Sequence, residues 1–406
     1  MVGASSIRVD RTSEGFAAVE IQSSSSSCPV QPTLIVVLGM HRSGTSATTR
    51  ALETMGANLG DRLMPSQHDN PKGYFEDLDI NALNVELMYS AGVDWHALPS
   101  LDLGRLSREQ REQYQLRALG LLRDKCKGDT FAIKDPRVAR LMPFWQPLFD
   151  RLNARVLYVV TFRHPISVMR SLKKRDNFVA AKSYLLWLLH VTEALRSTKG
   201  KPRALLNYDR LMESPREELA RLAATLGLEL NEQRVDTFVH DFLEQGLRHT
   251  QFSVADLDLA ESMPPIVKEL FRALELLVGD PSPSNEKACQ EVLAKAEEFL
   301  QNFESIADYE WALEGDLEQL GTRLASAQHS LSQLQQTQDQ LRQTQGQLQQ
   351  AQAQLQQTQA QFEQAAMAMN SVVNSTSWKL TAPLRWTKLE LRKLAGTLRS
   401  QHLGGA

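Results

Sequence analysis

The chain has few cysteines and no long uncharged apolar run. Its 406 residues include three cysteines, Cys28, Cys126 and Cys289, and no CxxC pair. This usage excludes a disulfide scaffold and favours a reducing compartment. No uncharged stretch approaches the roughly 20 residues of a membrane span, and the polar start with early acidic residues lacks the pattern of a signal peptide. We therefore expect a soluble, cytoplasmic protein.

A strong charge of either sign is also missing. The 45 Lys/Arg and 48 Asp/Glu give a net charge of −3, so we expect no nucleic-acid polymer as a partner. An apolar share of 42% over 406 residues suffices for one sizeable α/β domain with additional elements. Residues 1–32 are polar, with serines at 23–27, and predict a disordered leader.

The most informative stretch is residues 34–50, LIVVLGMHRSGTSATTR. An apolar run typical of a buried parallel strand precedes a turn with two glycines, and the residues up to 55 suit a helix. The backbone of such a turn and the start of its helix bind phosphate or sulfate, and Arg42 adds a guanidinium that suits their oxygens. Because Thr45 stands where the NTPase P-loop has its lysine, the stretch predicts a nucleotide phosphate site without ATP hydrolysis. A plain strand–turn–helix corner is the alternative.

Strand-plus-helix units recur at 34–55, 130–150, 155–175 and 203–227. Ser107 and Gln110 have the spacing of a capping box before a further helix, and residues 286–303 predict a helix of their own. The strand-plus-helix units predict an α/β fold in which a P-loop-like parallel sheet, flanked by helices, spans residues 33–303. Ligands of such sheets gather at the carboxyl ends of the strands. Lys134 and Arg137 follow one strand, while Arg163 follows another and precedes Ser171 by eight residues. These positions suit an anionic ligand, and surface turns with internal ion pairs are the other interpretation.

Charge is unevenly distributed along this domain. Residues 134–175 hold ten Lys/Arg and two Asp/Glu, which favours a small polyanionic ligand over a set of solvated helix faces. Residues 64–84, MPSQHDNPKGYFEDLDINALN, instead bring carboxylates beside two aromatics. Glu76, Asp77 and Asp79 are candidates for a general base. A solvated acidic turn that caps the following helix explains the same pattern, and the residues alone leave both interpretations open.

Three blocks resemble the PAPS-dependent sulfotransferase family, most closely its bacterial members. GMHRSGTS (39–46) resembles the family's loop for the 5′-phosphosulfate, RHPISVMRS (163–171) its 3′-phosphate motif, and NYDRLMESP (207–215) a segment that places Tyr208 near the nucleotide. NPKGYFED (70–77) and KDPR (134–137) resemble blocks common in bacterial members. The likeness covers roughly residues 34–300. Ala47 departs from it, because many cytosolic members have an adenine-stacking tryptophan there. No GxxGxWK segment is evident, and the region of Arg248, His249 and Thr250 is the candidate replacement.

The resemblance implies in-line transfer of a sulfuryl group from PAPS to an acceptor hydroxyl or amine, without a metal. It assigns Arg42 and residues 43–46 to the phosphosulfate, with Arg42 also counted as catalytic, and Arg163 with Ser171 to the 3′-phosphate. Glu76 is the preferred base, because related carbohydrate-type members use a glutamate, and Asp77 is the second choice. His41 is a third candidate or a loop-packing residue. The full expected donor-binding set is His41, Arg42, Ser43, Gly44, Thr45, Ser46, Lys134, Arg137, Arg163, Ser171 and Tyr208.

The C-terminal third has a different pattern. From Leu313 a seven-residue period places leucine, alanine or phenylalanine at d up to Phe362. Leucine occupies a until Leu331, and glutamine takes that position from Gln338 to Gln359. Eighteen of the 37 residues between 328 and 364 are glutamine. The pattern predicts a long, Gln-rich coiled-coil helix over 312–366 that self-associates or pairs with a partner helix; a lone frayed helix is the alternative.

Residues 370–406 form a basic amphipathic tail. Residues 374–386, NSTSWKLTAPLRW, resemble a segment of bacterial polysaccharide-synthesis proteins. Six Lys/Arg, one Glu and two tryptophans between 378 and 399 suit an anionic membrane surface at the inner face of the membrane, and a packed tail suits them equally. The favoured function is a sulfotransferase acting on a carbohydrate or glycolipid. A P-loop nucleotide kinase and a non-catalytic coiled-coil scaffold in glycan assembly are the alternatives.

Overall fold

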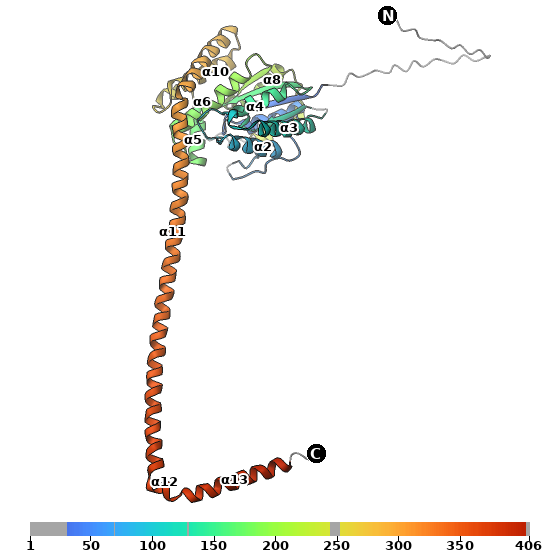
Figure 1. Cartoon of the computed structure of the whole chain (residues 1–406). Helices are drawn as coiled ribbons and strands as arrows, with labels where there is room; N and C mark the ends of the chain where they lie inside the picture. Colours follow the sequence, from blue (N-terminus) through green and yellow to red (C-terminus); the bar gives the residue numbers. More distant parts are fainter. Residues whose placement is uncertain (1–30, 69, 128–129, 244–251, 403–406) are drawn as a thin grey trace, which may run out of the picture. The chain divides into compact units, whose positions relative to one another are not determined.

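The computed structural model describes residues 31–68, 70–127, 130–243 and 252–402, with side chains up to 393. The predicted leader up to residue 30 and the residues at 248–250 lie outside this range. The chain divides into two compact units, residues 1–314 and 315–406, which are described separately (Figure 1). In the described part of the chain, no helix has the length and apolar character that a membrane crossing requires.

The first unit is built on a four-stranded, fully parallel sheet with the order β2-β1-β3-β4. Its strands are β1 (Thr33–Leu38), β2 (Thr130–Lys134), β3 (Arg155–Phe162) and β4 (Arg203–Asn207). In β1, Leu34, Val36 and Leu38 enter one hydrophobic core, whereas Ile35 and Val37 enter a second core. Because both faces are buried, the strand is a continuous apolar run. The predicted P-loop-like α/β sheet is therefore confirmed.

Helices follow each strand, as the recurring pattern predicts. They are α1 (Thr45–Leu52) with the 3₁₀ turn η1 (Glu53–Met55), α4 (Val138–Phe149), α5 (Pro165–Asp176), and the pair α7 (Tyr208–Glu213) and α8 (Pro215–Leu226). Pro165 and Pro215 occupy the first helical turn, where a missing N–H costs no helical hydrogen bond. Gly227 ends α8 in a left-handed conformation.

The remaining helices pack around this core. Ser107 caps α3 with the capping box that its spacing from Gln110 predicts. The elements are α2 (Leu78–Ser90), η2 (Leu103–Arg105), α3 (Arg108–Lys125), α6 (Ala180–Ser197), α9 (Glu232–Thr237), the π-helical turn η3 (Phe238–Phe242), η5 (Val254–Leu259) and α10 (Pro265–Gly279). Side chains of α1 and α8 line the second core, and those of α2, α3, α4, α5, α6 and α10 line the first.

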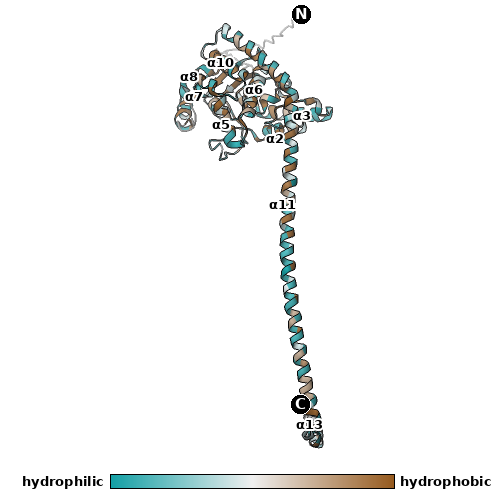
Figure 2. Cartoon of the chain, turned by 90° about the vertical axis from the view of Figure 1, so that its left-hand side faces the viewer, coloured by the Kyte–Doolittle hydropathy of each residue, from teal (hydrophilic) through white to brown (hydrophobic). Residues whose placement is uncertain are grey.

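The second unit is helical. Most of it is the C-terminal part of α11 (Pro283–Asn374), and α12 (Thr376–Leu380) and α13 (Ala382–His402) follow. The sequence predicts a separate helix at 286–303, but the chain continues as one helix because no proline occurs between 284 and 374. Every residue from 315 to 374 is exposed. Figure 2 shows apolar residues recurring among hydrophilic ones along this helix.

Candidate active site

The loop between β1 and α1 has an unusual backbone. Gly44 caps α1 at a φ of 88°, and Arg42, although not a glycine, has a φ of 66°. A Cβ atom on Gly44 would lie 2.0 Å from Cδ2 of Tyr208, so the tyrosine ring packs directly on the loop. The side chain of Ser43 is fully buried, and its Oγ has no hydrogen-bond partner among the described residues. Sterics therefore require glycine at position 44, where the loop meets α7.

Two arginines from separate turns, Arg42 and Arg163, line the same cavity beside this loop. Nε of Arg42 donates to Oγ of Ser171 over 2.8 Å, which joins the loop to α5. The Arg163 guanidinium lies 4.6 Å from the ring centroid of Tyr208, and its Nε is 3.5 Å from Oδ1 of Asp209. The resemblance assigned Arg42 and Ser171 to different ends of one ligand. In the structure they are direct neighbours, so the two expected subsites adjoin at this hydrogen bond.

A buried ion pair lies on the other side of the loop. Lys134, at the end of β2, places Nζ 2.6 Å from Oε1 of Glu76, 3.0 Å from the Tyr74 carbonyl oxygen and 3.3 Å from Oγ of Ser46. Nδ2 of Asn81 donates to the second oxygen of Glu76 over 2.9 Å. Burial raises the pKa of the Glu76 carboxyl, and Lys134 opposes that shift. The carboxylate is thus held by two donors in a fixed orientation.

The neighbouring acids have different surroundings. Asp77 caps α2 by accepting from the N–H groups of Asp79 and Ile80, and it pairs with Lys125 at 2.6 Å. Its side chain is not among those that line the cavity described next. The sequence left a base and a helix cap as alternatives for residues 76 and 77, and the structure gives the cap to Asp77.

The loop after β1, the two arginines and the Lys134–Glu76 pair all line one large cavity of about 920 Å³. All the predicted site residues line it except Ser43, Asp77 and Asp79. Eight Lys/Arg and two carboxylates, Glu76 and Asp176, face it. The cations are Arg42, Lys72, Lys134, Arg137, Arg163, Arg170, Lys174 and Arg175. A concave site with this excess of positive charge attracts a polyanionic small molecule.

One part of the cavity lining, here called the aromatic rim, consists of His41 and Trp95. The rings of His41 and Trp95 lie 4.3 Å apart, and the Arg175 guanidinium lies 5.1 Å from the Trp95 ring centroid. Burial, together with Arg137 and Arg175, lowers the pKa of His41 well below its ordinary value. Its Nε2 has no hydrogen-bond partner among the described residues. Burial thus favours the neutral form of the His41 imidazole, whose Nε2 is enclosed without a protein partner among the described residues.

Sequence reasoning missed several lining residues. Trp95 belongs to no recognised motif, Lys72 lies in the block 70–77 but was assigned no role, and Lys174 and Arg175 were counted only in the basic surplus of residues 134–175. It also missed the support of Arg137, whose Nη1 lies 3.1 Å from Oδ1 of the fully buried Asp135. Because these residues come from different elements, only their distribution of charge was visible in the sequence.

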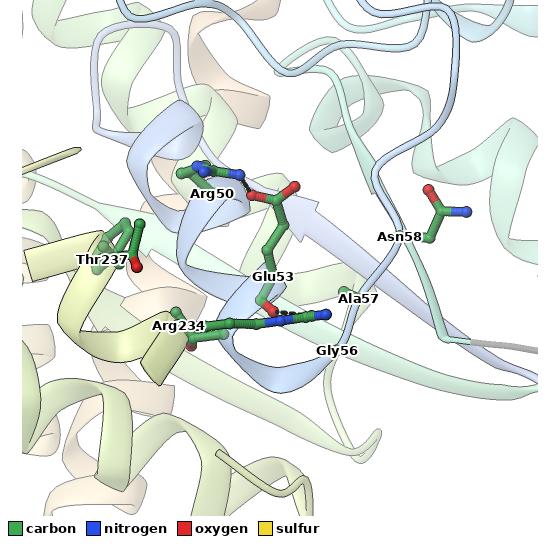
Figure 3. Close-up of a pocket in the computed structure, with 9 residues that line it drawn as sticks. Arg50, Glu53, Gly56, Ala57, Asn58, Arg234 and Thr237 are labelled. Carbon is green, nitrogen blue, oxygen red and sulfur yellow. Dashed lines mark hydrogen bonds and ion pairs between the residues drawn. The ribbon is translucent and has the colours of Figure 1, made fainter. Parts of the chain in front are cut away.

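A second, smaller cavity of about 410 Å³ lies between α1 and α9. Figure 3 shows the side chains of Arg50 and Glu53 turned toward each other, and the two form an ion pair. Nη1 of Arg234 donates to the Glu53 carbonyl oxygen over 2.9 Å. The residues that line it include two arginines and one carboxylate, so it offers less positive charge to an anion than the larger cavity does. Among the described residues, no group of three or more His, Cys, Asp or Glu is arranged to hold a metal ion.

Comparisons with known proteins give distant likenesses. No protein-family model matches the chain, and no curated protein matches it. Among solved structures, it is similar to the sulfotransferase domain of the Synechococcus PCC 7002 olefin synthase, with a TM-score of 0.35, 19% identity, and coverage of 60% of this chain and 95% of that one. For the sulfotransferase domain of the curacin biosynthetic pathway, the TM-score is 0.33, the identity 16% and the coverage 66% and 98%. For retinol dehydratase, in complex with androsterone and the inactive cofactor PAP, the TM-score is 0.27 and the identity 14%, and the match covers 68% of this chain and 81% of that one. At these values, function must be argued from the cavity.

Proposed function

We propose that the protein is a sulfotransferase that moves a sulfuryl group from PAPS to a hydroxyl or amine of a carbohydrate or glycolipid acceptor. The observation that carries the proposal is the shared cavity: Arg42, Arg163 and Glu76 all line it. A donor with phosphates at two ends needs cations from more than one turn, and a proton acceptor must lie within hydrogen-bond reach of the attacking group.

The residues present fit such a donor. PAPS supplies an activated sulfuryl group, and the chain supplies the contacts that hold it. The loop backbone at 43–46, the positive end of α1 and Arg42 would bind the phosphosulfate, and Arg163 with Ser171 would bind the 3′-phosphate. Gly44, Thr45 and Ser46 of this loop line the cavity, and so do Arg42, Arg163 and Ser171.

Two neighbouring side chains would carry the chemistry. Glu76, held by Lys134 and Asn81, would accept the proton of the acceptor hydroxyl. Lys134, which also reaches Ser46, would neutralise negative charge that develops on the leaving oxygens. A carboxylate with a raised pKa suits this task, because it is closer in acidity to the group that it deprotonates.

The aromatic rim supports an acceptor with a sugar ring. Trp95 and His41 both present ring surface to the cavity. Flat aromatic faces combined with a few polar groups are typical of sites that bind ring-shaped polar ligands. Which carbohydrate or glycolipid is used is to be found by testing acceptors.

Titration calorimetry with PAP tests the donor site. We expect Arg42→Ala and Arg163→Ala to weaken PAP binding roughly 10- to 100-fold each, since a hydrogen bond to a charged group contributes about 1.5–3 kcal/mol. Arg108→Ala is the control, because Arg108 is exposed, pairs with Glu112 and is not among the residues that line the cavity. Undiminished PAP binding in both cavity variants would refute the site, and tight binding of ATP in place of PAP would favour a nucleotide kinase.

A further inference from the structure

The apolar stripe of α11 has no partner within the described chain. Leu317, Leu334 and Leu348 are 60%, 66% and 59% exposed, and Phe362 is 73% exposed. The seven-residue register that starts at Leu313 continues beyond 362 through Ala366, Met369 and Val373, one residue before α11 ends. The register therefore covers about 60 residues, or roughly 90 Å at 1.5 Å per residue, well above the three to four heptads that indicate a coiled coil.

The seam changes composition half-way along. Both a and d are mostly leucine up to Leu331, whereas glutamine occupies four successive a positions from Gln338 to Gln359 while d keeps Leu341, Leu348 and Leu355. A glutamine amide carries both donors and acceptors, so it needs a polar partner when a second helix covers it. Whether the second helix provides that partner depends on its orientation.

Parallel and antiparallel pairs place different residues opposite the glutamines. In a parallel, in-register pair each a residue faces the same a residue of the other helix, so every glutamine meets a glutamine and every d leucine meets a leucine. In an antiparallel pair, a layers face d layers, and the glutamines would be buried against leucines with no amide to bond. Buried polar groups without partners are unfavourable, and polar a residues are known to set register and strand number.

The flanks of the seam favour an identical partner. Of the ten e and g positions between 328 and 358, only Arg342 is charged. The g threonines 337, 344 and 358 already donate to carbonyl oxygens of their own helix, over 2.8–2.9 Å. A foreign helix would usually be selected by e and g charges, and these are missing here. Two copies of this chain meet no charge repulsion along these rows.

From these observations we infer that α11 pairs with α11 of a second copy of this chain, as a parallel, in-register, two-stranded coiled coil. The glutamine layers set the register, and the leucine layers provide the burial. The inference does not depend on the proposed function, because none of these residues lies at the cavity.

Disulfide trapping on the full chain tests it. Gln359→Cys places a cysteine at an a position near one end of the seam, and Gln357→Cys places one at the outward f position two residues away. A disulfide needs Cα atoms about 4.4–6.8 Å apart, so mild oxidation should link two copies of the first variant and leave the second unlinked. The native Cys126 and Cys289 are buried, and oxidised wild-type protein gives the baseline. Light scattering should give twice the chain mass of 45.6 kDa.

The remaining outcomes overturn the inference. A single-chain mass across micromolar concentrations excludes pairing, and a threefold mass excludes two strands. A doubled mass without linkage of Gln359→Cys indicates an antiparallel or shifted pair, since position 359 lies far from the middle of the seam. Equal linkage of both variants indicates random collision. As a second route, Leu341→Lys with Leu348→Lys should halve the wild-type mass, and an unchanged mass contradicts the seam.

Discussion

Replacing Glu76 by glutamine separates proton transfer from donor binding in the large cavity. The substitution keeps the size of the side chain but removes its charge and its ability to accept a proton. Lys134 keeps the Tyr74 carbonyl oxygen at 3.0 Å and Oγ of Ser46 at 3.3 Å as acceptors. Because Glu76 would contact the acceptor and not the donor, PAP binding should change by no more than about threefold, or about 0.7 kcal/mol.

The expected loss of turnover follows from the role of a general base. Such a group contributes about 10²- to 10⁴-fold, so kcat should fall by that factor, which is roughly 3–5 kcal/mol at 1.36 kcal/mol per tenfold. The amide also turns a donor toward either Lys134 or Asn81, both of which are donors. One badly matched buried hydrogen bond costs about 1–3 kcal/mol, so a fall in Tm of several degrees is expected as well.

The pH dependence provides a second measurement. Burial raises the pKa of Glu76 above its ordinary value of 4.5, so kcat of the wild type should fall on acidification through a step above pH 4.5. The variant should lack this step. For stability the sign is opposite: the folded chain holds this proton more tightly than the unfolded chain. The stabilisation that Glu76 adds to the folded state through this proton is fully present below the pKa of the unfolded chain and is lost as pH rises through the pKa of the folded chain.

The assay is transfer of radiolabelled sulfate, combined with PAP calorimetry and thermal unfolding of the same preparations. Asp77→Asn is the matched control, because it alters the neighbouring carboxylate, whose side chain caps α2; it should lower Tm and retain turnover. Turnover of Glu76→Gln within threefold of the wild type would remove Glu76 as the base. In that case His41→Asn, which removes the unpartnered ring nitrogen, should abolish turnover.

Three further predictions concern the loop, the core and the tail. Gly44→Ala should weaken PAP binding more than tenfold, because its Cβ would lie 2.0 Å from the Tyr208 ring. The control is Gly56→Ala, which has a similar φ of 82° and nothing within 4 Å and should cost only about 1–2 kcal/mol of stability. Equal PAP affinity of the two variants would contradict this prediction. Burial lowers the pKa of His190 to about 3, so the free energy of unfolding should fall as pH drops below 6.5, by up to about 1.4 kcal/mol per pH unit. Urea titrations at pH 7, 6 and 5 should show that the free energy of unfolding of His190→Leu depends less steeply on pH than that of the wild type. An unchanged pH dependence would refute this prediction. A peptide of residues 370–406 should float with anionic but not neutral vesicles, because six Lys/Arg lie between 378 and 399, and failure to bind anionic vesicles would end the proposal of a membrane-surface tail.

Local elements were largely predictable because their signals lie close together in the sequence. The apolar runs at 34–38 and 155–162 are strands β1 and β3, and Ser107 with Gln110 predicted the capping box of α3 to the residue. The helix at 286–303 was predicted as a separate element. Because no proline occurs between 284 and 374, helical hydrogen bonding continues without a break to Asn374.

The contacts of the cavity were not predictable in the same way. Lys134 and Glu76 are 58 residues apart and Arg42 and Ser171 are 129 apart, and no spacing rule relates such positions. The sequence could assign each residue to the end of a strand or to a loop. It could not say that Arg42 would bond Ser171, or that Asp77 would cap a helix while Glu76 faced the cavity.

By itself, then, the order of residues determined the parallel α/β sheet, the glycine-bearing loop after β1 and the seven-residue apolar repeat in α11, because each depends on periodicity or on neighbours a few positions away. Only the tertiary structure decided which of two adjacent carboxylates is paired with Lys134 and that two distant arginines line one cavity. The strand order β2-β1-β3-β4 brings β2 and β3 to either side of β1. Their carboxyl ends then converge on the loop, and the charges that follow them meet there.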